Sequence, residues 1–275
     1  MYVVIMAGGL GKRMNSDLPK VLHTINGVPM LVKIIVTALK LTPDKILIVV
    51  GRYKQLIEAT VNRFITDCSK IEYITQEPAL GTGHAVACCR DYLLQINTNI
   101  DKNLESNVLI LSGDVPLITE QTLQSILSSM TLADNKALIV TTKMEDPHGY
   151  GRIISEQMQF VKIVEEKDCS ESERTIQQVN TGIYVFDKAL LCKYLPYITN
   201  SNSQNEYYLT DIVEIIKTRE KVQVGLYEIE RERQHEIVGV NTPEQLTFLE
   251  THGETPLTPN YVLDLARGQR SIVPL

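Results

Sequence analysis

Features typical of secreted and membrane proteins are missing from this sequence. No apolar run approaches the length of a membrane span, and no basic leader precedes the first apolar run, so we expect neither a membrane anchor nor a signal peptide. The five cysteines contain no Cys-x-x-Cys pair, and the adjacent Cys88 and Cys89 suit neither a zinc site nor an easy disulfide. We therefore expect reduced, buried thiols in a cytoplasmic protein.

An excess of basic residues is also absent. The chain has 27 Lys and Arg against 33 Asp and Glu, a net charge of −6, which argues against a general nucleic-acid-binding protein. An anionic ligand would therefore need cations gathered locally in a cleft. No internal repeat is present, and no hexapeptide pattern of a parallel β-helix follows Asn241. A length of 275 residues with 44% hydrophobic content fits one large α/β domain, alone or with a small appendage.

Three well-known catalytic or nucleotide-binding motifs fail at identifiable positions. A P-loop requires Ser or Thr after Gly-Lys, but Arg13 follows Gly11-Lys12. The dinucleotide-binding fingerprint requires a third small residue where Met14 stands. Ser112 lacks the Gly-x-Ser-x-Gly elbow of a hydrolase triad. The glycines near the start of the chain therefore belong to a turn of another kind.

The first apolar run and the turn after it form the most informative stretch of the sequence. From Val3 an apolar, β-branched run without a polar break predicts a strand buried on both faces. The run ends in the turn Gly8–Gly11, where glycines without a Cβ let backbone N–H groups approach an anion. Arg13 and Lys20 follow with positive charge. We interpret this stretch as a polyphosphate-binding turn; the alternative is an ordinary glycine turn after a buried strand.

The order of periodic segments predicts the fold class. Strands alternate with helices in the first half of the chain, which implies right-handed crossovers and a mostly parallel sheet flanked by helices. The strands expected there are the run from Val3, Lys45–Gly51, Ile71–Ile74 and Asn107–Asp114. The expected helices are Pro29–Leu41, Tyr53–Thr66, Gly83–Leu94 and Thr119–Met130.

Shorter strands follow, which predicts a smaller β-rich lobe. The expected strands are Ala137–Thr142, Gly151–Ile154, Phe160–Glu165, Val179–Phe186, Val222–Tyr227 and Glu236–Val238. A helix is expected over Tyr207–Arg219, and a last helix starts after Thr242 as its cap. Lys167–Gln178 reads as a solvated loop or short helix and Thr199–Asn205 as an exposed loop or lid. We expect one domain over residues 1–250, with residues 1–135 and 136–250 as its two halves, and an irregular arm of residues 251–275.

Polar residues stand where the ligands of an open α/β sheet bind. Asp114 ends a buried strand, so it should share one cleft with the glycine turn, and a carboxylate beside phosphates suits Mg²⁺. The alternative is that Asp114 merely starts a turn. Gln76, in a second glycine turn, offers a donor and an acceptor that suit a pyrimidine edge, unless that turn is plain structure. Side chains that could hydrogen-bond sugar hydroxyls, or be ordinary structure, are Glu165, Asn180, Tyr208 and Thr210.

A series of short motifs between Tyr2 and Leu249 matches, in order and approximate spacing, the motifs of a known enzyme family. The motifs are Gly8–Met14, Ser16–His23, Leu80–Ala85, Gly113–Leu117, Gly149–Ile153, Val164–Asp168, Asn180–Tyr184, Glu206–Ile212 and Gly239–Asn241. Together they resemble the sugar-1-phosphate nucleotidyltransferases. Within that family the chain looks like the uridylyltransferase domain of the bifunctional N-acetylglucosamine-1-phosphate uridylyltransferase/glucosamine-1-phosphate acetyltransferases.

The resemblance implies a Rossmann-like nucleotide-diphospho-sugar transferase fold and an Mg²⁺-dependent reaction. UTP and N-acetyl-α-D-glucosamine 1-phosphate would give UDP-N-acetylglucosamine and pyrophosphate, by in-line attack on the α-phosphorus. Arg13 and Lys20 would hold the triphosphate and act in catalysis with Asp114, while Asp114 and Asn241 would bind Mg²⁺. The nucleotide, bound mainly by residues 1–135, would contact Met6, Ala7, Gly8, Gly9, Gln76, Gly81, Thr82, Ser112 and Gly113. The sugar phosphate, bound mainly by residues 136–250, would contact Gly151, Glu165, Asn180, Tyr208 and Thr210.

The chain departs from the family pattern in the glycine turn and in domain content. Ala7-Gly8-Gly9 stands where the family usually has Ala-Ala-Gly, and Leu10-Gly11-Lys12-Arg13 where it usually has Lys-Gly-Thr-Arg. Another NTP or hexose 1-phosphate is therefore an alternative substrate, and a non-catalytic nucleotide-sugar-binding module is a third hypothesis. We expect no β-helix acetyltransferase domain. The family's trimer is built largely by that domain, so the resemblance leaves any homo-oligomer open.

Overall fold

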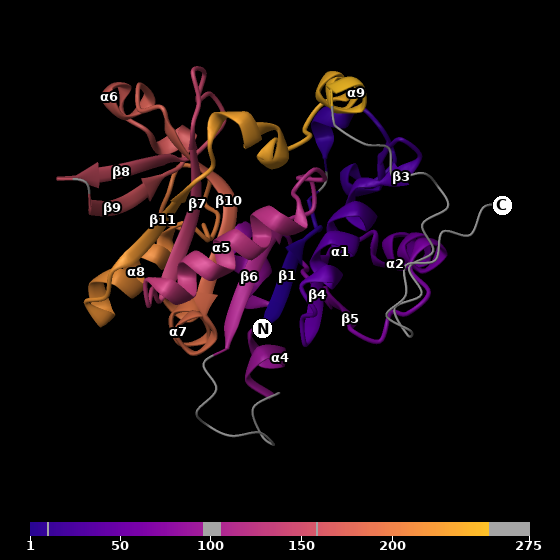
Figure 1. Cartoon of the computed structure of the whole chain (residues 1–275), viewed down its shortest axis with the longest axis horizontal. Helices are drawn as coiled ribbons and strands as arrows, with labels where there is room; N and C mark the ends of the chain where they lie inside the picture. Colours follow the sequence, from indigo (N-terminus) through magenta and orange to yellow (C-terminus); the bar gives the residue numbers. More distant parts are fainter. Residues whose placement is uncertain (10, 96–105, 158, 253–275) are drawn as a thin grey trace.

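The computed structural model describes residues 1–9, 11–95, 106–157 and 159–252, and its central feature is a nine-stranded sheet (Figure 1). Its main path runs in the order β11-β7-β10-β6-β1-β4-β5, and the hairpin β8-β9 joins at β10. The strands are β1 Tyr2–Met6, β4 Lys45–Val50, β5 Ile71–Thr75, β6 Asn107–Ser112, β7 Ala137–Lys143, β8 Arg152–Glu156, β9 Gln159–Val164, β10 Gln178–Asp187 and β11 Val224–Glu228. The α/β class expected from the sequence is confirmed.

The two halves of the sheet differ in strand direction. In the first half, β5, β4, β1 and β6 are parallel to one another, as the strand–helix alternation predicts. In the second half, β10 runs antiparallel to both β6 and β7, whereas β11 is parallel to β7. The hairpin β8-β9 is antiparallel and contacts β10 at Val179. The β-rich part after residue 136 therefore continues the same sheet.

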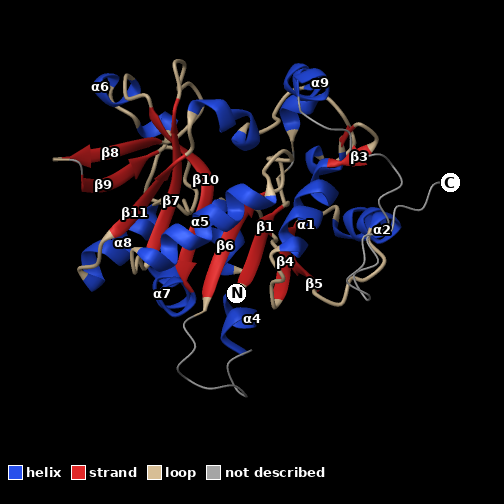
Figure 2. Cartoon of the chain, in the orientation of Figure 1, coloured by secondary structure: helices blue, strands red, loops and turns tan. Residues whose placement is uncertain are grey.

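Helices cover both faces of the sheet (Figure 2). They are α1 Met30–Lys40, α2 Lys54–Phe64, α3 Thr82–Ala87, α4 Arg90–Gln95, α5 Glu120–Leu132, α6 Glu171–Arg174, α7 Lys188–Tyr194, α8 Asp211–Glu220 and α9 Pro243–His252. Alternate residues of a strand face opposite sides of the sheet. Accordingly, Val3 and Ile5 of β1 pack in the core with residues of α1, α2 and α5, whereas Val4 packs in the core with residues of α3, α4, α7 and α8.

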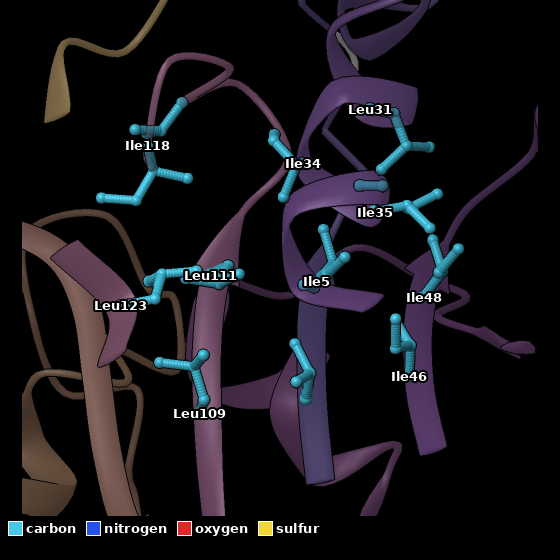
Figure 3. Packing of buried hydrophobic residues seen from close by; sticks show 14 of the residues in the cluster. Ile5, Leu31, Ile34, Ile35, Ile46, Ile48, Leu109, Leu111, Ile118 and Leu123 are labelled. Atoms are coloured by element: carbon cyan, nitrogen blue, oxygen red, sulfur yellow. The ribbon is translucent and has the colours of Figure 1, made fainter. Parts of the chain in front are cut away.

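The core on the α1 side supports the strands that carry the glycine turn and Asp114 (Figure 3). Ile5 of β1 lies between Ile48 of β4 and Leu111 of β6, and the pairing of these strands sets that order. Ile34 of α1 and all three of these residues are 1% exposed or less. Complete burial of such a side chain contributes roughly 1.5–3 kcal/mol, so the ends of β1 and β6 stand on a rigid base.

Two expected elements differ from the structure. The single helix expected over Gly83–Leu94 is two short helices, because Cys88 and Cys89 form a turn in which Cys89 N bonds to Val86 O at 3.0 Å. The strand expected over Glu236–Val238 is wrong. That segment ends the 3₁₀-helix Arg231–Ile237, where the buried Glu236 carboxylate accepts hydrogen bonds from the start of α5.

Two elements have no counterpart in the expected set. Helix α7 was not expected, although Asp187 caps it by accepting from Leu190 N at 2.9 Å, which is a sequence-level start signal. The hairpin of β2 (Thr24–Ile25) and β3 (Val28–Pro29) turns through Asn26 and Gly27, a typical hairpin dipeptide. The expected arm of residues 251–275 lies outside the described residues from 253 onward. In the described part of the chain, no helix has the length and apolar character needed to cross a bilayer.

Candidate functional site

The carboxyl ends of β1 and β6 lie side by side and bring two predicted site segments together (Figure 1). Met6, the last residue of β1, pairs with Ser112, the last residue of β6. Gly113 N donates to Met6 O at 2.9 Å, and a Cβ on Gly113 would lie 2.8 Å from the same oxygen. Glycine permits this close approach. The glycine turn after β1 and Asp114 after β6 therefore meet at one edge of the sheet.

A polar cluster joins the four charged or metal-binding residues predicted from the sequence. Lys20 Nζ donates to Asp114 Oδ2 and, at 3.2 Å, to Asn241 Oδ1. Arg13 Nη2 donates to the same Asn241 oxygen at 2.9 Å, and Ser112 Oγ donates to Asp114 Oδ1 at 2.6 Å. The Lys20 and Asp114 side chains are only 16% and 15% exposed, so water screens their attraction less than at an open surface.

The basic loop after β1 is held by backbone geometry and by one buried side chain. Gly11 has φ +60°, and a Cβ there would lie 2.5 Å from Lys20 Cβ, so a larger residue would displace the lysine. Met14 is buried in a small apolar cluster with Val240 and Leu249. Met14 therefore packs the loop against the segment that precedes α9. That segment carries Asn241, the residue of the polar cluster that comes last in the chain.

Asn241 is positioned by the start of α9. Val240 N donates to Asp114 O at 2.9 Å, which ties this segment to the end of β6. Gln245 Oε1 accepts from Asn241 N at 2.7 Å and from Thr242 N at 3.2 Å, while Gln245 N donates to Thr242 Oγ1 at 3.3 Å. This reciprocal pair is a capping box, so the predicted cap at Thr242 is confirmed. The same bonds hold the Asn241 backbone.

The oxygens of Asp114 and Asn241 fit a magnesium ion. Asp114 Oδ2 and Asn241 Oδ1 both accept from Lys20 Nζ, so the two oxygens face one position that can hold a positive charge. Mg²⁺ prefers oxygen ligands and is commonly held by one or two protein groups together with substrate phosphates and water. Among the residues the structure describes, no group of three or more His, Cys, Asp or Glu is arranged to bind a metal, which argues against a zinc-type site in those ranges.

A second turn, after β5, lies against the glycine turn. The Gln76 side chain is 5% exposed, and its Nε2 donates to Gly81 O at 3.0 Å. A Cβ on Gly8 would lie 3.2 Å from Gln76 Oε1, so the two turns touch. Gly81 has φ +108°, and a Cβ there would lie 2.6 Å from Tyr207 O. Leu209 N donates to Thr82 Oγ1 at 3.0 Å, which connects this turn to the segment that carries the predicted sugar-binding residues.

A cavity of about 410 Å³ runs from the polar cluster toward β10. The predicted site residues that line it are Met6, Arg13, Thr82, Ser112, Asp114, Gly151, Glu165, Asn180, Thr210 and Asn241. The predicted residues outside its lining are Ala7, Gly8, Gly9, Lys20, Gln76, Gly81, Gly113 and Tyr208. Tyr208 instead lines a neighbouring cavity of about 830 Å³, which shares Arg13 and Glu165 with the first.

Hydrogen-bonding groups suited to hydroxyls line the far end of the cavity. Burial raises the pKa of the Glu165 carboxyl, although the Thr210 hydroxyl donates to its Oε1 at 3.1 Å and works in the opposite direction. Asn180 Nδ2 donates to Tyr184 Oη at 2.6 Å. A Cβ on Gly151 would lie 3.4 Å from Glu165 Oε2, so glycine leaves this carboxylate accessible. The predicted sugar-binding residues Gly151, Glu165, Asn180 and Thr210 therefore do gather in space.

Several cavity residues were missed by the sequence reasoning. They are His148, Gly149, Tyr150, Thr181, Gly182, Tyr184 and Gln245, together with some apolar neighbours. Tyr150 lines the same cavity as Asp114, and burial together with the charge of Asp114 raises the pKa of Tyr150. Most of these residues belong to motifs already singled out around Gly151 and Asn180. Gln245 could have been found from its position three residues after the Thr242 cap.

Comparisons with known proteins identify a family and several relatives of this chain. Residues 2–231 match the family model described as nucleotidyl transferase. A protein of Acanthamoeba polyphaga mimivirus, named "Probable UDP-N-acetylglucosamine pyrophosphorylase", is 42% identical over 91% of this chain and 95% of its own length. The "Bifunctional protein GlmU" of Caldanaerobacter subterraneus subsp. tengcongensis is 41% identical over 90% of this chain.

The relatives named GlmU are longer than the region they share with this chain. The chain spans 50% of the Caldanaerobacter protein and 46% of the GlmU protein of Streptococcus uberis. A solved structure of UDP-glucose pyrophosphorylase complexed with UDP-glucose superimposes with a TM-score of 0.70, over 91% of this chain and 97% of that one, at 15% identity. That likeness shows the fold, which is the Rossmann-like fold expected from the sequence. By its matched length and its similarity to these relatives, the chain belongs to the nucleotidyl transferase family.

Proposed function

We propose that this protein is an N-acetylglucosamine-1-phosphate uridylyltransferase, which forms UDP-N-acetylglucosamine and pyrophosphate from UTP and N-acetyl-α-D-glucosamine 1-phosphate. The observation that carries the proposal is the position of Lys20, which bonds to both Asp114 and Asn241 beside a glycine turn. A mimivirus relative whose name carries this activity matches nearly its whole length, which supports the same substrates. A cytoplasmic location and any homo-oligomer stay predictions.

The nucleotide would lie along the first half of the sheet edge. The backbone of Met6–Gly9 would line the nucleotide. Ala7 N donates to Val49 O at 2.8 Å, so the N–H groups of Gly8 and Gly9 would face the phosphates, and Arg13 and Lys20 would neutralise their charge. Gln76, Gly81 and Thr82 would contact the uracil, with Ser112 and Gly113 beside the nucleotide. The sugar phosphate would enter the cavity from the other half, where the groups that bind it are Gly151, Glu165, Asn180, Tyr208 and Thr210.

The chemistry requires positioning and charge more than proton transfer. The second pKa of a phosphate monoester is about 6, so the attacking oxygen is largely ionised at neutral pH and needs no general base. The obstacle is repulsion between two polyanions. Arg13 and Lys20 would reduce this repulsion by binding the triphosphate. They would also position it so that the sugar phosphate oxygen attacks the α-phosphorus in line with the departing pyrophosphate. Mg²⁺ held by Asp114 and Asn241 would supply further neutralisation of phosphate charge.

Pyrophosphate release with UTP, N-acetylglucosamine 1-phosphate and Mg²⁺ tests the proposal. We expect turnover that requires all three components. The four common NTPs and a small set of hexose 1-phosphates, assayed in parallel, would reveal a different substrate pair. Turnover with none of these pairs would instead favour a binding module without catalysis and would reject the proposed activity.

A further inference from the structure

The amide nitrogen of the Gln76 side chain has two hydrogen-bonding neighbours. Its Nε2 lies 3.0 Å from Gly81 O and 3.2 Å from His84 Nδ1. A backbone carbonyl can only accept, so the side-chain atom facing Gly81 must be the NH₂ group. Both of its hydrogens are then used, one on Gly81 O and one on His84 Nδ1. His84 must consequently present an unprotonated Nδ1, with its ring proton on Nε2.

The other end of the same amide is left as an acceptor. In the described part of the chain, Nε2 makes both hydrogen bonds of the Gln76 side chain, and Oε1 makes none. It lies beside the phosphate-binding turn, because a Cβ on Gly8 would be 3.2 Å from it. Gln76 is 5% exposed, and its side-chain oxygen is an acceptor that lies beside the turn expected to bind the nucleotide.

An acceptor at this place distinguishes the two pyrimidine bases. Uracil carries a hydrogen on ring nitrogen N3 and can donate to Oε1. Cytosine has a lone pair on N3, so it would face Oε1 with a second acceptor. To accept cytosine at N3 the amide would have to turn over, which would place its oxygen against Gly81 O and leave the NH₂ group without its two acceptors. Buried groups left unpaired in this way are costly.

We infer that His84 is a positioning residue that sets the nucleotide preference, by holding the Gln76 amide with its oxygen toward the base. This inference rests on the proposed function and deepens it. His84 acts through Gln76 and needs no contact with the substrate. The centroid of its ring also lies 6.3 Å from that of the Tyr207 ring, and Cys88 Sγ is 3.9 Å from its Nε2, so Tyr207 and Cys88 are both neighbours of the imidazole.

The test uses two variants at position 84 and one control at Cys88, in the turn that follows α3. His84→Asn keeps an oxygen acceptor near the place of Nδ1, whereas His84→Leu fills similar space with no acceptor. Cys88→Ala removes the weak contact on the opposite side of the ring. For each variant, kcat and KM are measured with UTP and with CTP, and equilibrium binding of UTP and CTP with Mg²⁺ is measured without the sugar phosphate.

We expect His84→Leu to lower the UTP-to-CTP ratio of kcat/KM, and of binding, by roughly tenfold, the effect of one lost buried hydrogen bond. His84→Asn should recover most of the ratio, Cys88→Ala should keep it, and the KM for the sugar phosphate should stay the same in all three. A folded His84→Leu variant with the wild-type ratio would overturn the inference alone. Wild-type protein that binds CTP as well as UTP would overturn both the inference and the uridine preference of the proposed function.

Discussion

Replacing Asp114 with Asn separates the catalytic role of this carboxylate from its structural one. The substitution preserves side-chain shape and the acceptor for Ser112 Oγ, but it removes the charge that faces Lys20. The cost in stability should be small, about 1 kcal/mol, because Lys20 keeps its bond to Asn241 Oδ1 at 3.2 Å. The cost in activity should be much larger. Loss of one preorganised charge stabiliser typically lowers kcat by about 10²–10³, equivalent to about 2.7–4 kcal/mol.

The assay follows pyrophosphate release by Asp114→Asn over a range of Mg²⁺ concentrations, with urea unfolding measured on the same preparations. Ser112→Ala is the matched control, since it removes a neutral hydrogen bond to the same carboxylate and keeps the charge. We expect it to lose about tenfold or less. A folded Asp114→Asn variant that keeps more than about a tenth of wild-type kcat/KM, or loses no more than Ser112→Ala does, would contradict the catalytic role of this carboxylate.

Three further predictions follow from contacts around the site. Gln245→Ala should raise the Mg²⁺ concentration needed for half-maximal activity several-fold, because it frees the Asn241 backbone; unchanged Mg²⁺ dependence would contradict this. Gly113→Ala should lower the free energy of unfolding by about 1–3 kcal/mol in urea titrations, since its Cβ would lie 2.8 Å from Met6 O. Burial and nearby carboxylates raise the pKa of Asp211 to about 6, so between about pH 4 and pH 6 the folded form holds a proton that the unfolded form has lost. Its charge therefore destabilises the fold as pH rises from about 4 to 6, and Asp211→Asn should raise the Tm at pH 8 but not at pH 4; equal gains at both would refute the assignment.

Local patterns predicted the first half of the sheet well. The apolar runs that became β1, β4 and β6 are buried on both faces, so hydrophobicity alone reports them. The cap at Thr119 is another local signal, because Thr122 N bonds to its side chain within one helical turn. Such features depend on residues a few positions apart, and a single sequence carries that information.

Short elements were less predictable for the same reason. Glu236 precedes the apolar pair Ile237-Val238, a pattern that favours a strand, but its carboxylate accepts hydrogen bonds from Thr119 and Thr122, more than a hundred residues earlier. The turn at Cys88 and Cys89 interrupts a helical pattern with no glycine or proline to announce it. Tertiary packing decided both.

In the candidate site too, local motifs were predictable from the sequence, whereas contacts between distant segments were not. The sequence by itself determined that a glycine turn with following cations, an acid at a strand end and a later asparagine segment exist, since each is a short motif with its own chemistry. Only the tertiary structure decided that Lys20 bridges Asp114 and Asn241, and that His84 orients Gln76. These contacts depend on distances and directions between side chains from separate turns, which sequence spacing does not encode.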